Sequence, residues 1–309
     1  MARSFFNLFL ILLFLNLSGC MGEKERLVNA WKPGTSSGLF DEFSQSEFDE
    51  FRNEGINCIE IGSGVFSKKT QEEKETWVED IRQKTEKSGI RVWSIHLPFS
   101  RIYDISSVND THRVNMIREC SDIIALCEPL DPQKFVIHGS SEPIADSARA
   151  ERIANCIGSL KILTEEVKKY NARIAIECLP RTCLGNTADE LVMIVNSVGN
   201  GLEVCFDSNH LLKEKPEEFA AKAGSLISTV HMSDYDGIDE RHWLPGMGII
   251  NWTNVISELV RAGYNGPFMF EASRRKPAAD GTTDKTKLTA EELVGSFNQL
   301  KNNYLGSLK

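Results

Sequence analysis

The sequence lacks the cysteine arrangements that are typical of zinc fingers and redox centres. It has eight cysteines in 309 residues, and none of them forms a CxxC pair or the paired spacing of a zinc ribbon. Cys58, Cys178 and Cys205 stand inside short apolar runs, where a free cysteine behaves as a small buried hydrophobe. Disulfides are therefore not needed to explain this chain.

The sequence also lacks a basic stripe. Its formal net charge is −9, and its densest basic run is Arg274-Arg275-Lys276. An acidic protein repels the phosphate backbone of nucleic acids, so we expect no nucleic-acid partner. With 41% hydrophobic and 26% charged residues, the composition is that of an ordinary globular protein.

The one long apolar run lies at the N-terminus. It extends from Phe5 to Leu17 and is followed by Ser18-Gly19-Cys20. The run is short for a membrane span, and it resembles a bacterial lipoprotein signal. That resemblance implies a signal peptide over 1–19, lipidation of Cys20, a short tether over 20–25 and an exported protein anchored to a membrane, on the periplasmic or cell-surface side. An ordinary cleaved signal or a short anchor is the alternative.

No repeat, low-complexity block or Pro/Gly/Ser linker divides residues 26–309, so we predict one domain there. Short apolar runs alternate in it with amphipathic helical segments, several of which end at a glycine. The eight runs are Leu27–Trp31, Asn57–Gly62, Ile90–Leu97, Lys134–Gly139, Ala172–Cys178, Leu202–Asp207, Leu226–Ser233 and Pro267–Ala272. Eight alternating units predict an α/β protein with a closed (β/α)8 TIM barrel. A doubly wound open sheet is the alternative.

Six of these runs end, or nearly end, in a residue that can bind a metal or move a proton. These residues are His96, His138, Glu177, Asp207, His231 and Glu271. In a closed barrel the carboxyl ends of the strands meet at one mouth, where active sites are built. Burying so many polar groups without partners is costly, and this favours a function for the set.

Two glutamates, an aspartate and a histidine make a mixed oxygen and nitrogen ligand set. Glu177, Asp207, His231 and Glu271 are therefore predicted to bind one divalent ion, such as Mn, Mg, Co or Zn. Each residue alone has a plainer interpretation: a hydrogen-bonded histidine of the scaffold, a buried ion-pair glutamate, or an aspartate that caps a turn. The prediction depends on the four occurring together.

The ordered motifs at these strand ends resemble the xylose isomerase-like barrel superfamily, from about residue 26 to the end of the chain. The matching segments are Ile95-His96-Leu97-Pro98, Val136-Ile137-His138-Gly139, Ile176-Glu177, Asp207-Ser208-Asn209-His210, His231-Met232-Ser233-Asp234, Pro245-Gly246-Met247-Gly248 with Trp252, and Phe270-Glu271. The resemblance to its ketose epimerases implies that the four ligands hold one metal, that Glu177 and Glu271 also move protons, and that His210 contacts a substrate oxygen. Cys183 stands where those epimerases have a further glutamate, which argues against simple transfer of their 3-epimerisation.

The superfamily also includes endonuclease IV-type nucleases, which bind three metals through nine ligands. The matching residues are His96, His138, Glu177, Asp207, His210, His231, Glu240, His242 and Glu271. Glu240-Arg241-His242 stands in place of their Asp-Arg-His motif. A nuclease is thus one alternative, disfavoured by the acidic charge and the predicted export.

The prediction is a metal-dependent sugar isomerase or epimerase that removes a proton next to a carbonyl through an enediolate. Its small carbohydrate substrate is expected to be an unphosphorylated sugar or keto-sugar, because sugar phosphates are scarce outside the cytoplasm. Predicted substrate contacts are His96, His138, His210, Arg181, Glu60 and His242, with Trp31, Phe66, Phe99 and Trp243 as candidate packing residues. A keto-glycoside lyase or hydratase would use the same residues, and a non-catalytic carbohydrate-binding lipoprotein would need the pocket without the metal. A homo-oligomer is compatible with the sequence, and the membrane is expected to be contacted only through the lipid anchor.

Overall fold

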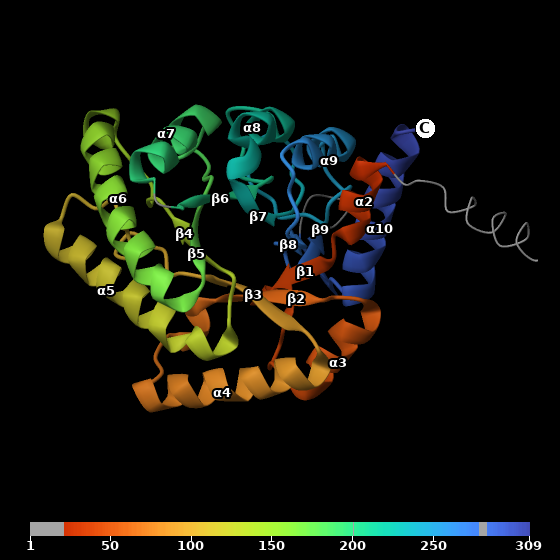
Figure 1. Cartoon of the computed structure of the whole chain (residues 1–309), viewed down its shortest axis with the longest axis horizontal. Coiled ribbons are helices and arrows are strands. Elements are labelled where there is room, and N and C mark those ends of the chain that lie inside the picture. The colour runs from red at the N-terminus through yellow and green to blue at the C-terminus, as the bar shows by residue number, and fades with distance from the viewer. Residues whose placement is uncertain (1–21, 200, 278–282) are drawn as a thin grey trace, which may run out of the picture.

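The computed structural model describes residues 22–199, 201–277 and 283–309. The predicted signal peptide and Cys20 lie outside the described residues. Eight parallel strands alternate with helices: β1 (Pro33–Ser36), β2 (Cys58–Gly62), β3 (Arg91–His96), β4 (Lys134–His138), β5 (Arg173–Glu177), β6 (Glu203–Asp207), β7 (Ile227–His231) and β8 (Phe268–Phe270). Figure 1 shows the helices as an outer ring around these strands. They are α2 (Glu23–Ala30), α3 (Gln45–Glu54), α4 (Gln71–Ser88), α5 (Asp110–Leu126), α6 (Asp146–Val167), α7 (Ala188–Val198), α8 (Pro216–Ala223), α9 (Trp252–Arg261) and α10 (Ala290–Ser307).

The sheet is ordered β7-β6-β5-β4-β3-β2-β1-β8, and its two ends meet. Met232, directly after β7, donates its N–H to the carbonyl of Met269 in β8 over 2.8 Å and forms a parallel bridge with Phe270. The strands therefore close into the predicted TIM barrel, and the open doubly wound sheet is wrong. Closure brings the carboxyl ends of all eight strands to a single mouth.

The strand and helix residues follow the expected patterns closely. Strand side chains such as Ile59, Ile176 and Phe206 are fully buried, as expected for a parallel sheet covered on both faces. The prediction that helices end at glycines is confirmed for α3 and α4, because Gly55 and Gly89 directly follow them in the left-handed conformation. These two glycines therefore lie in the short connections from α3 to β2 and from α4 to β3.

The predicted first strand, Leu27–Trp31, is wrong. Those residues belong mainly to α2, which contacts α9 on the outside of the barrel, and β1 begins two residues later at Pro33. The segment Pro33-Gly34-Thr35-Ser36 is not an apolar run, so hydrophobicity does not reveal it. Its glycine is required by packing: a Cβ on Gly34 would lie 2.6 Å from the sulfur of Cys58 and 2.9 Å from the side chain of Met269.

Two further features lie outside the barrel strands. A short antiparallel hairpin, β9 (Arg275–Pro277) and β10 (Thr283–Lys287), precedes α10. Of the predicted tether over 20–25, residues 23–25 lie in α2. Among the helices that the structure describes, none has the length and apolar character needed to cross a bilayer.

Candidate metal centre

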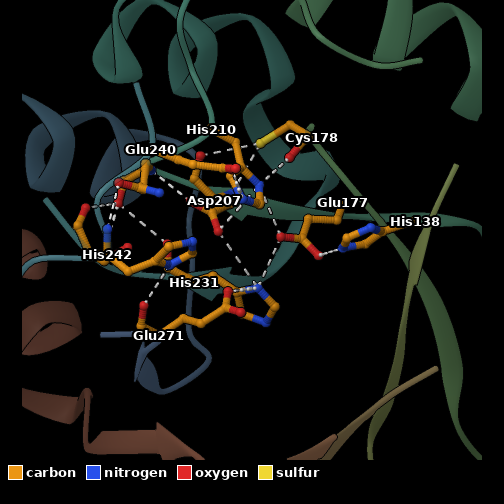
Figure 2. Close-up of polar contacts among 12 residues, drawn as sticks. His138, Glu177, Cys178, Asp207, His210, His231, Glu240, His242 and Glu271 are labelled. Carbon is orange, nitrogen blue, oxygen red and sulfur yellow. Dashed lines mark hydrogen bonds and ion pairs between the residues drawn. The ribbon is translucent and has the colours of Figure 1, made fainter. Parts of the chain in front are cut away.

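The four predicted ligands converge at the mouth of the barrel. Glu177, Asp207 and His231 are the last residues of β5, β6 and β7, and Glu271 directly follows β8. One ligand atom from each residue lies within 4.8 Å of the ligand atoms of the other three. Figure 2 shows Glu177 and Glu271 approaching His231 from two sides. The sequence prediction that these four distant residues meet agrees with this geometry.

The ligand atoms surround the Nδ1 nitrogen of His231. Nδ1 lies 2.7 Å from Oε2 of Glu271, 3.2 Å from Oε1 of Glu177 and 4.0 Å from Oδ2 of Asp207. Asp207 Oδ2 and Glu271 Oε2 are buried, and within the described residues neither accepts a hydrogen bond of regular geometry, although His210 Nδ1 lies 3.4 Å from the first and His231 Nδ1 2.7 Å from the second. Buried carboxylate oxygens without such hydrogen bonds are costly, and a cation would satisfy both. The residues present thus fit a divalent ion with three oxygen ligands and one nitrogen ligand.

Glu60 holds the far side of the His231 ring. Its two carboxylate oxygens lie 3.0 and 3.1 Å from Nε2 of His231, and its Oε2 also accepts a hydrogen bond from Ser94 over 2.7 Å. A carboxylate behind a ligating histidine fixes the ring orientation and its tautomer. Sequence reasoning places Glu60 among the substrate contacts; in the structure it is buried and supports a metal ligand, although it also borders a cavity.

Three more histidines surround Glu177. Nε2 of His96 and Nε2 of His138 lie 3.1 and 3.2 Å from its Oε2, and Nδ1 of His210 lies 3.3 Å from its Oε1. Because the Glu177 side chain is only 1% exposed, these contacts replace water around the carboxylate. The predicted substrate contacts His96, His138 and His210 therefore also position a ligand.

Burial and charge act against each other in this cluster. Burial alone would raise the pKa of Glu177, but His231 and His138 outweigh it and hold that pKa well below its usual value. Burial raises the pKa of Asp207 to about 7, only partly offset by His210. Burial would lower the pKa of His231, yet Cys205 and the surrounding carboxylates raise it well above its usual value. The cluster therefore holds protons that an incoming cation must displace.

A second group of ligand atoms lies beside the first. His210, Glu240 and His242 bring one ligand atom each within 4.8 Å of one another, and Nε2 of His210 lies 3.3 Å from Oε2 of Glu240. The hydrogen bond from His210 is the main reason that the pKa of Glu240 falls to about 2, despite burial. All nine residues of the nuclease-like pattern thus gather at the mouth.

Arg181 is a predicted substrate contact whose partners the sequence does not reveal. Its guanidinium pairs with Glu142 at 2.8 Å, Asp239 at 2.7 Å and Glu240 at 2.6 Å. These carboxylates belong to the loops after β4 and β7, so Arg181 links three loops over the mouth. The sequence alone does not show which loop carboxylates form ion pairs with Arg181.

Asp234 anchors the loop after β7. The sequence motif His231-Met232-Ser233-Asp234 contains this residue but does not indicate that role. It is fully buried and accepts hydrogen bonds from the backbone N–H groups of Tyr235, Gly246 and Ile250 and from the indole of Trp252. The segment between these contacts includes Glu240 and His242. The composition of this segment suggests only a flexible loop, so its anchoring is a finding of the structure.

Two cavities open at the metal centre. The larger, about 770 Å³, is bordered by Glu60, His96 and Glu271, and the smaller, about 390 Å³, by His138, Arg181, Cys183, His210, His242 and Glu271. Glu271 borders both cavities, whereas Glu177 borders neither. All six predicted substrate contacts therefore border one of the two spaces.

The four candidate aromatic residues have different environments. Phe99 is 54% exposed and borders both cavities, and Phe66 borders the larger one. Trp31 instead packs in the core, with its indole donating to the carbonyl of Tyr264 over 2.8 Å. Trp243 pairs with the backbone of Asp234 and borders neither of these cavities. Trp31 is thus not a sugar-packing residue.

Comparison with known proteins gives matches over much of the chain. Inosose isomerase from Halalkalibacterium halodurans is 28% identical over 158 residues, which is 47% of this chain and 52% of that protein. A protein from Methanocaldococcus jannaschii is 29% identical over 185 residues, 57% of this chain and 63% of that protein. The matches thus span less than two thirds of these relatives.

The fold is shared with solved structures of similar size. The crystal structure of a D-tagatose 3-epimerase-like protein superposes with a TM-score of 0.73 at 22% identity, covering 90% of this chain and 100% of that one. The model of the xylose isomerase-like TIM barrel family matches residues 48–293, well over half of the sequence. With its closed barrel and its polar strand ends, the chain belongs to the xylose isomerase-like TIM barrel family.

Proposed function

We propose that the protein is a divalent-metal-dependent sugar isomerase or epimerase that moves a proton at the carbon next to a carbonyl. The observation that supports this most is the arrangement of Glu177 and Glu271 around one histidine nitrogen, from strands separated by β6 and β7. The names of similar proteins, an inosose isomerase and a D-tagatose 3-epimerase-like protein, agree with it.

Glu271 is the group best placed to exchange a proton with substrate. Its side chain is 28% exposed and faces both cavities, while the buried His231 contacts it and keeps its pKa low against the effect of burial. A divalent ion held by the four ligands would polarise the substrate carbonyl and stabilise the negative charge that develops beside it. Glu271 would accept the proton, and the neighbouring carbon would become part of an enediolate.

Glu177 is the second group proposed to exchange a proton with the substrate. It does not border a cavity itself, but His138 and His210 contact it and border the smaller cavity. A proton could therefore pass between Glu177 and the substrate side through the imidazole of His138, whereas the second nitrogen of His210 is paired with Glu240. We place the reacting sugar in this smaller cavity, which His242 and Arg181 also border.

The test is exchange of substrate hydrogen with solvent deuterium. Purified protein loaded with Mn²⁺ is incubated in D₂O with a panel of ketoses, aldoses and keto-glycosides, and products are analysed by NMR and mass spectrometry. We expect deuterium at the carbon next to the carbonyl, loss of exchange with a chelator, and at least about 100-fold slower exchange in Glu271→Gln, within the range of a general base. Glu86→Gln, on the exposed surface of α4, is the matched control.

The same experiment separates the competing functions. Release of an unsaturated fragment would indicate a lyase, and binding without exchange on any sugar would indicate a carbohydrate-binding protein. A parallel incubation with abasic DNA tests the nuclease that the nine gathered residues suggest. Nicking of that DNA together with no sugar exchange would contradict the proposal.

We also propose that the protein is exported and lipidated at Cys20. Cys20 and the apolar run before it lie outside the described residues, and the sequence pattern is what supports the proposal. Expression in a bacterial host should give a membrane-associated protein whose N-terminal peptide has the mass of an acylated cysteine. Cys20→Ala should abolish the lipid and release the protein from membranes; an unmodified Cys20 in the wild type would contradict this.

A further inference from the structure

We propose that the larger cavity is a second subsite, which binds an anionic unit attached to the reacting sugar. This inference rests on the proposed function, because it places the reacting sugar at Glu271. The substrate would then be an acidic glycoside whose unit farther from the reacting carbon has a carboxylate, in agreement with the unphosphorylated substrate expected from the sequence, or a phosphate, which would contradict that expectation.

The two cavities adjoin each other beside the metal centre. Both are bordered by Phe99, Ser100 and Glu271. Ligand pockets commonly measure about 300–1,000 Å³. The smaller cavity, about 390 Å³, lies near the lower limit and suits a single sugar ring. The larger, about 770 Å³, has room for a further unit on the other side of Glu271.

Three lysines border the larger cavity. Lys68 and Lys69 lie in the turn between β2 and α4, and Lys74 lies in the first turn of α4. Away from the metal centre, Glu119 is the carboxylate that borders the same space. Of the other two carboxylates in the lining, Glu60 is paired with His231 and Glu271 is one of the four predicted metal ligands. The positive charge of the lysines that these pairings leave unbalanced occurs in a chain with a net charge of −9. It favours an anion in this cavity and not at the carboxylate-rich mouth.

These lysines are available to a ligand. Within residues 22–199, 201–277 and 283–309, none of the three is paired with a carboxylate at ion-pair distance. Lys69 has an electrostatic neighbour, Glu73, which is fully exposed and outside the cavity lining.

The arginines at the smaller cavity are engaged with the protein instead. Arg181 is paired with three carboxylates, and Arg101 donates to the carbonyl of Glu142 over 3.3 Å. Glu142 and Glu240 also border this smaller space and add negative charge to it. An anionic group is therefore bound more favourably in the larger cavity, beside the three lysines, than in the smaller one.

The rest of the lining suits a sugar unit. Serine hydroxyls border the cavity at positions 36, 37, 63, 67 and 100, and they can pair with sugar hydroxyls. Phe99 and Tyr103 are 54% and 41% exposed there; Phe99 stacks one face on His138, so Tyr103 and the other face of Phe99 are the aromatic surfaces that can stack on a sugar ring. Lysine ammonium groups bind carboxylate and phosphate alike, as point charges. The shared chemistry is therefore an anionic sugar unit.

The experiment measures binding of three non-reacting probes to the Mn²⁺-loaded full chain by titration calorimetry. They are methyl β-D-glucuronide, methyl β-D-glucoside 6-phosphate and the neutral methyl β-D-glucoside. We expect at least one charged probe to bind about tenfold more tightly than the neutral one, as three partly exposed ion pairs can produce. This preference should shrink at high salt, because exposed charges are screened. Which charged probe binds more tightly identifies the anion.

The variant is the triple substitution Lys68→Gln, Lys69→Gln and Lys74→Gln. Its matched control is Lys87→Gln, Lys161→Gln and Lys168→Gln, which removes the same charge from exposed positions on α4, α6 and the turn after α6. We expect the first triple variant to lose the preference while keeping its metal content and its affinity for the neutral probe. The control should keep all three properties.

Two failures can be told apart. Equal affinity of the wild type for charged and neutral probes, or an unchanged preference in the lysine variant, would overturn the second subsite even if sugars exchange deuterium. Absence of deuterium exchange on every sugar would overturn the proposed reaction, while a lysine-dependent preference for the charged probes would still support the anion site.

Discussion

Glu60 and His231 form the contact that orients the metal centre. The Glu60 carboxylate lies 3.0 and 3.1 Å from Nε2 of His231, so that Nδ1 faces Glu177, Asp207 and Glu271. The two residues are 171 positions apart in the sequence and both are buried. The ligand ring is therefore fixed before any ion arrives, which lowers the cost of ordering it on binding.

Replacing Glu60 by glutamine should weaken metal binding without removing a ligand. Loss of such a supporting carboxylate typically costs about 10–100-fold in metal affinity. We expect a reduction of this size for Mn²⁺, measured by calorimetric titration of the metal-free protein. Glu86→Gln, far from the site on α4, should bind like the wild type. Unchanged affinity in Glu60→Gln would show that the His231 ring is held by its other neighbours.

Metal affinity should rise with pH through neutrality. Burial raises the pKa of Asp207 to about 7, so below that pH its carboxyl holds a proton that the ion must displace. His231, with a pKa well above its usual value, must lose a proton as well. We expect the apparent affinity to fall at least about tenfold for each pH unit below 7, and proton release on binding. Titrations in buffers of different ionisation enthalpy measure both; a flat profile from pH 5 to 8 would contradict the protonated cluster.

Metal should stabilise the folded protein, because the four ligands are gathered only in the native state. A ligand present at 100 times its dissociation constant adds about 2.7 kcal/mol. For a chain of this size each kcal/mol raises the melting temperature by roughly 2–4 °C, so a rise of roughly 5–10 °C is expected. Differential scanning calorimetry with Mn²⁺ and with a chelator checks this. Asp207→Asn serves as the comparison, since its melting temperature should respond far less to the ion.

Asp234→Asn should loosen the loop that contains Glu240 and His242. The Asp234 carboxylate accepts four N–H hydrogen bonds, and an amide in its place would turn one acceptor into a donor facing those N–H groups. Leaving such a buried donor unsatisfied costs about 1–3 kcal/mol. Urea unfolding should show this loss, and limited proteolysis should cut first within residues 235–250. Asp236→Asn, in the same loop and more exposed, is the matched control.

The buried thiols should react slowly despite the predicted export. The seven cysteines within the described residues are free, and burial raises the pKa of Cys58 to about 12 and that of Cys183 to about 11. Alkylation needs the thiolate, so iodoacetamide labelling at pH 8 should be slow and should increase about tenfold per pH unit. Cys183 should react first, because it borders the smaller cavity. Peptide mapping checks the order, and protein unfolded in guanidinium should label at every cysteine.

Much of the fold is predictable from local signals. Glycines after amphipathic segments predict helix ends, and the structure has α3 and α4 ending at Gly55 and Gly89. The first strand is not predictable because its sequence is not an apolar run. Gly34 is needed there because the side chains of Cys58 and Met269, from two other strands, occupy the space that a Cβ would take. A pattern of neighbouring residues in the sequence cannot indicate a contact with a residue that is distant in the sequence.

By itself the sequence determined that polar residues end successive strands, and barrel closure is the general rule that brought Glu177, Asp207, His231 and Glu271 together. Only the tertiary structure decided the surroundings of the other polar groups: Glu60 lies behind His231, Arg181 bridges three loops and Lys68 borders a cavity. The reason is physical. Strand period and closure constrain where a strand residue points, whereas the partner of a loop or supporting side chain depends on packing between segments that are far apart in the sequence.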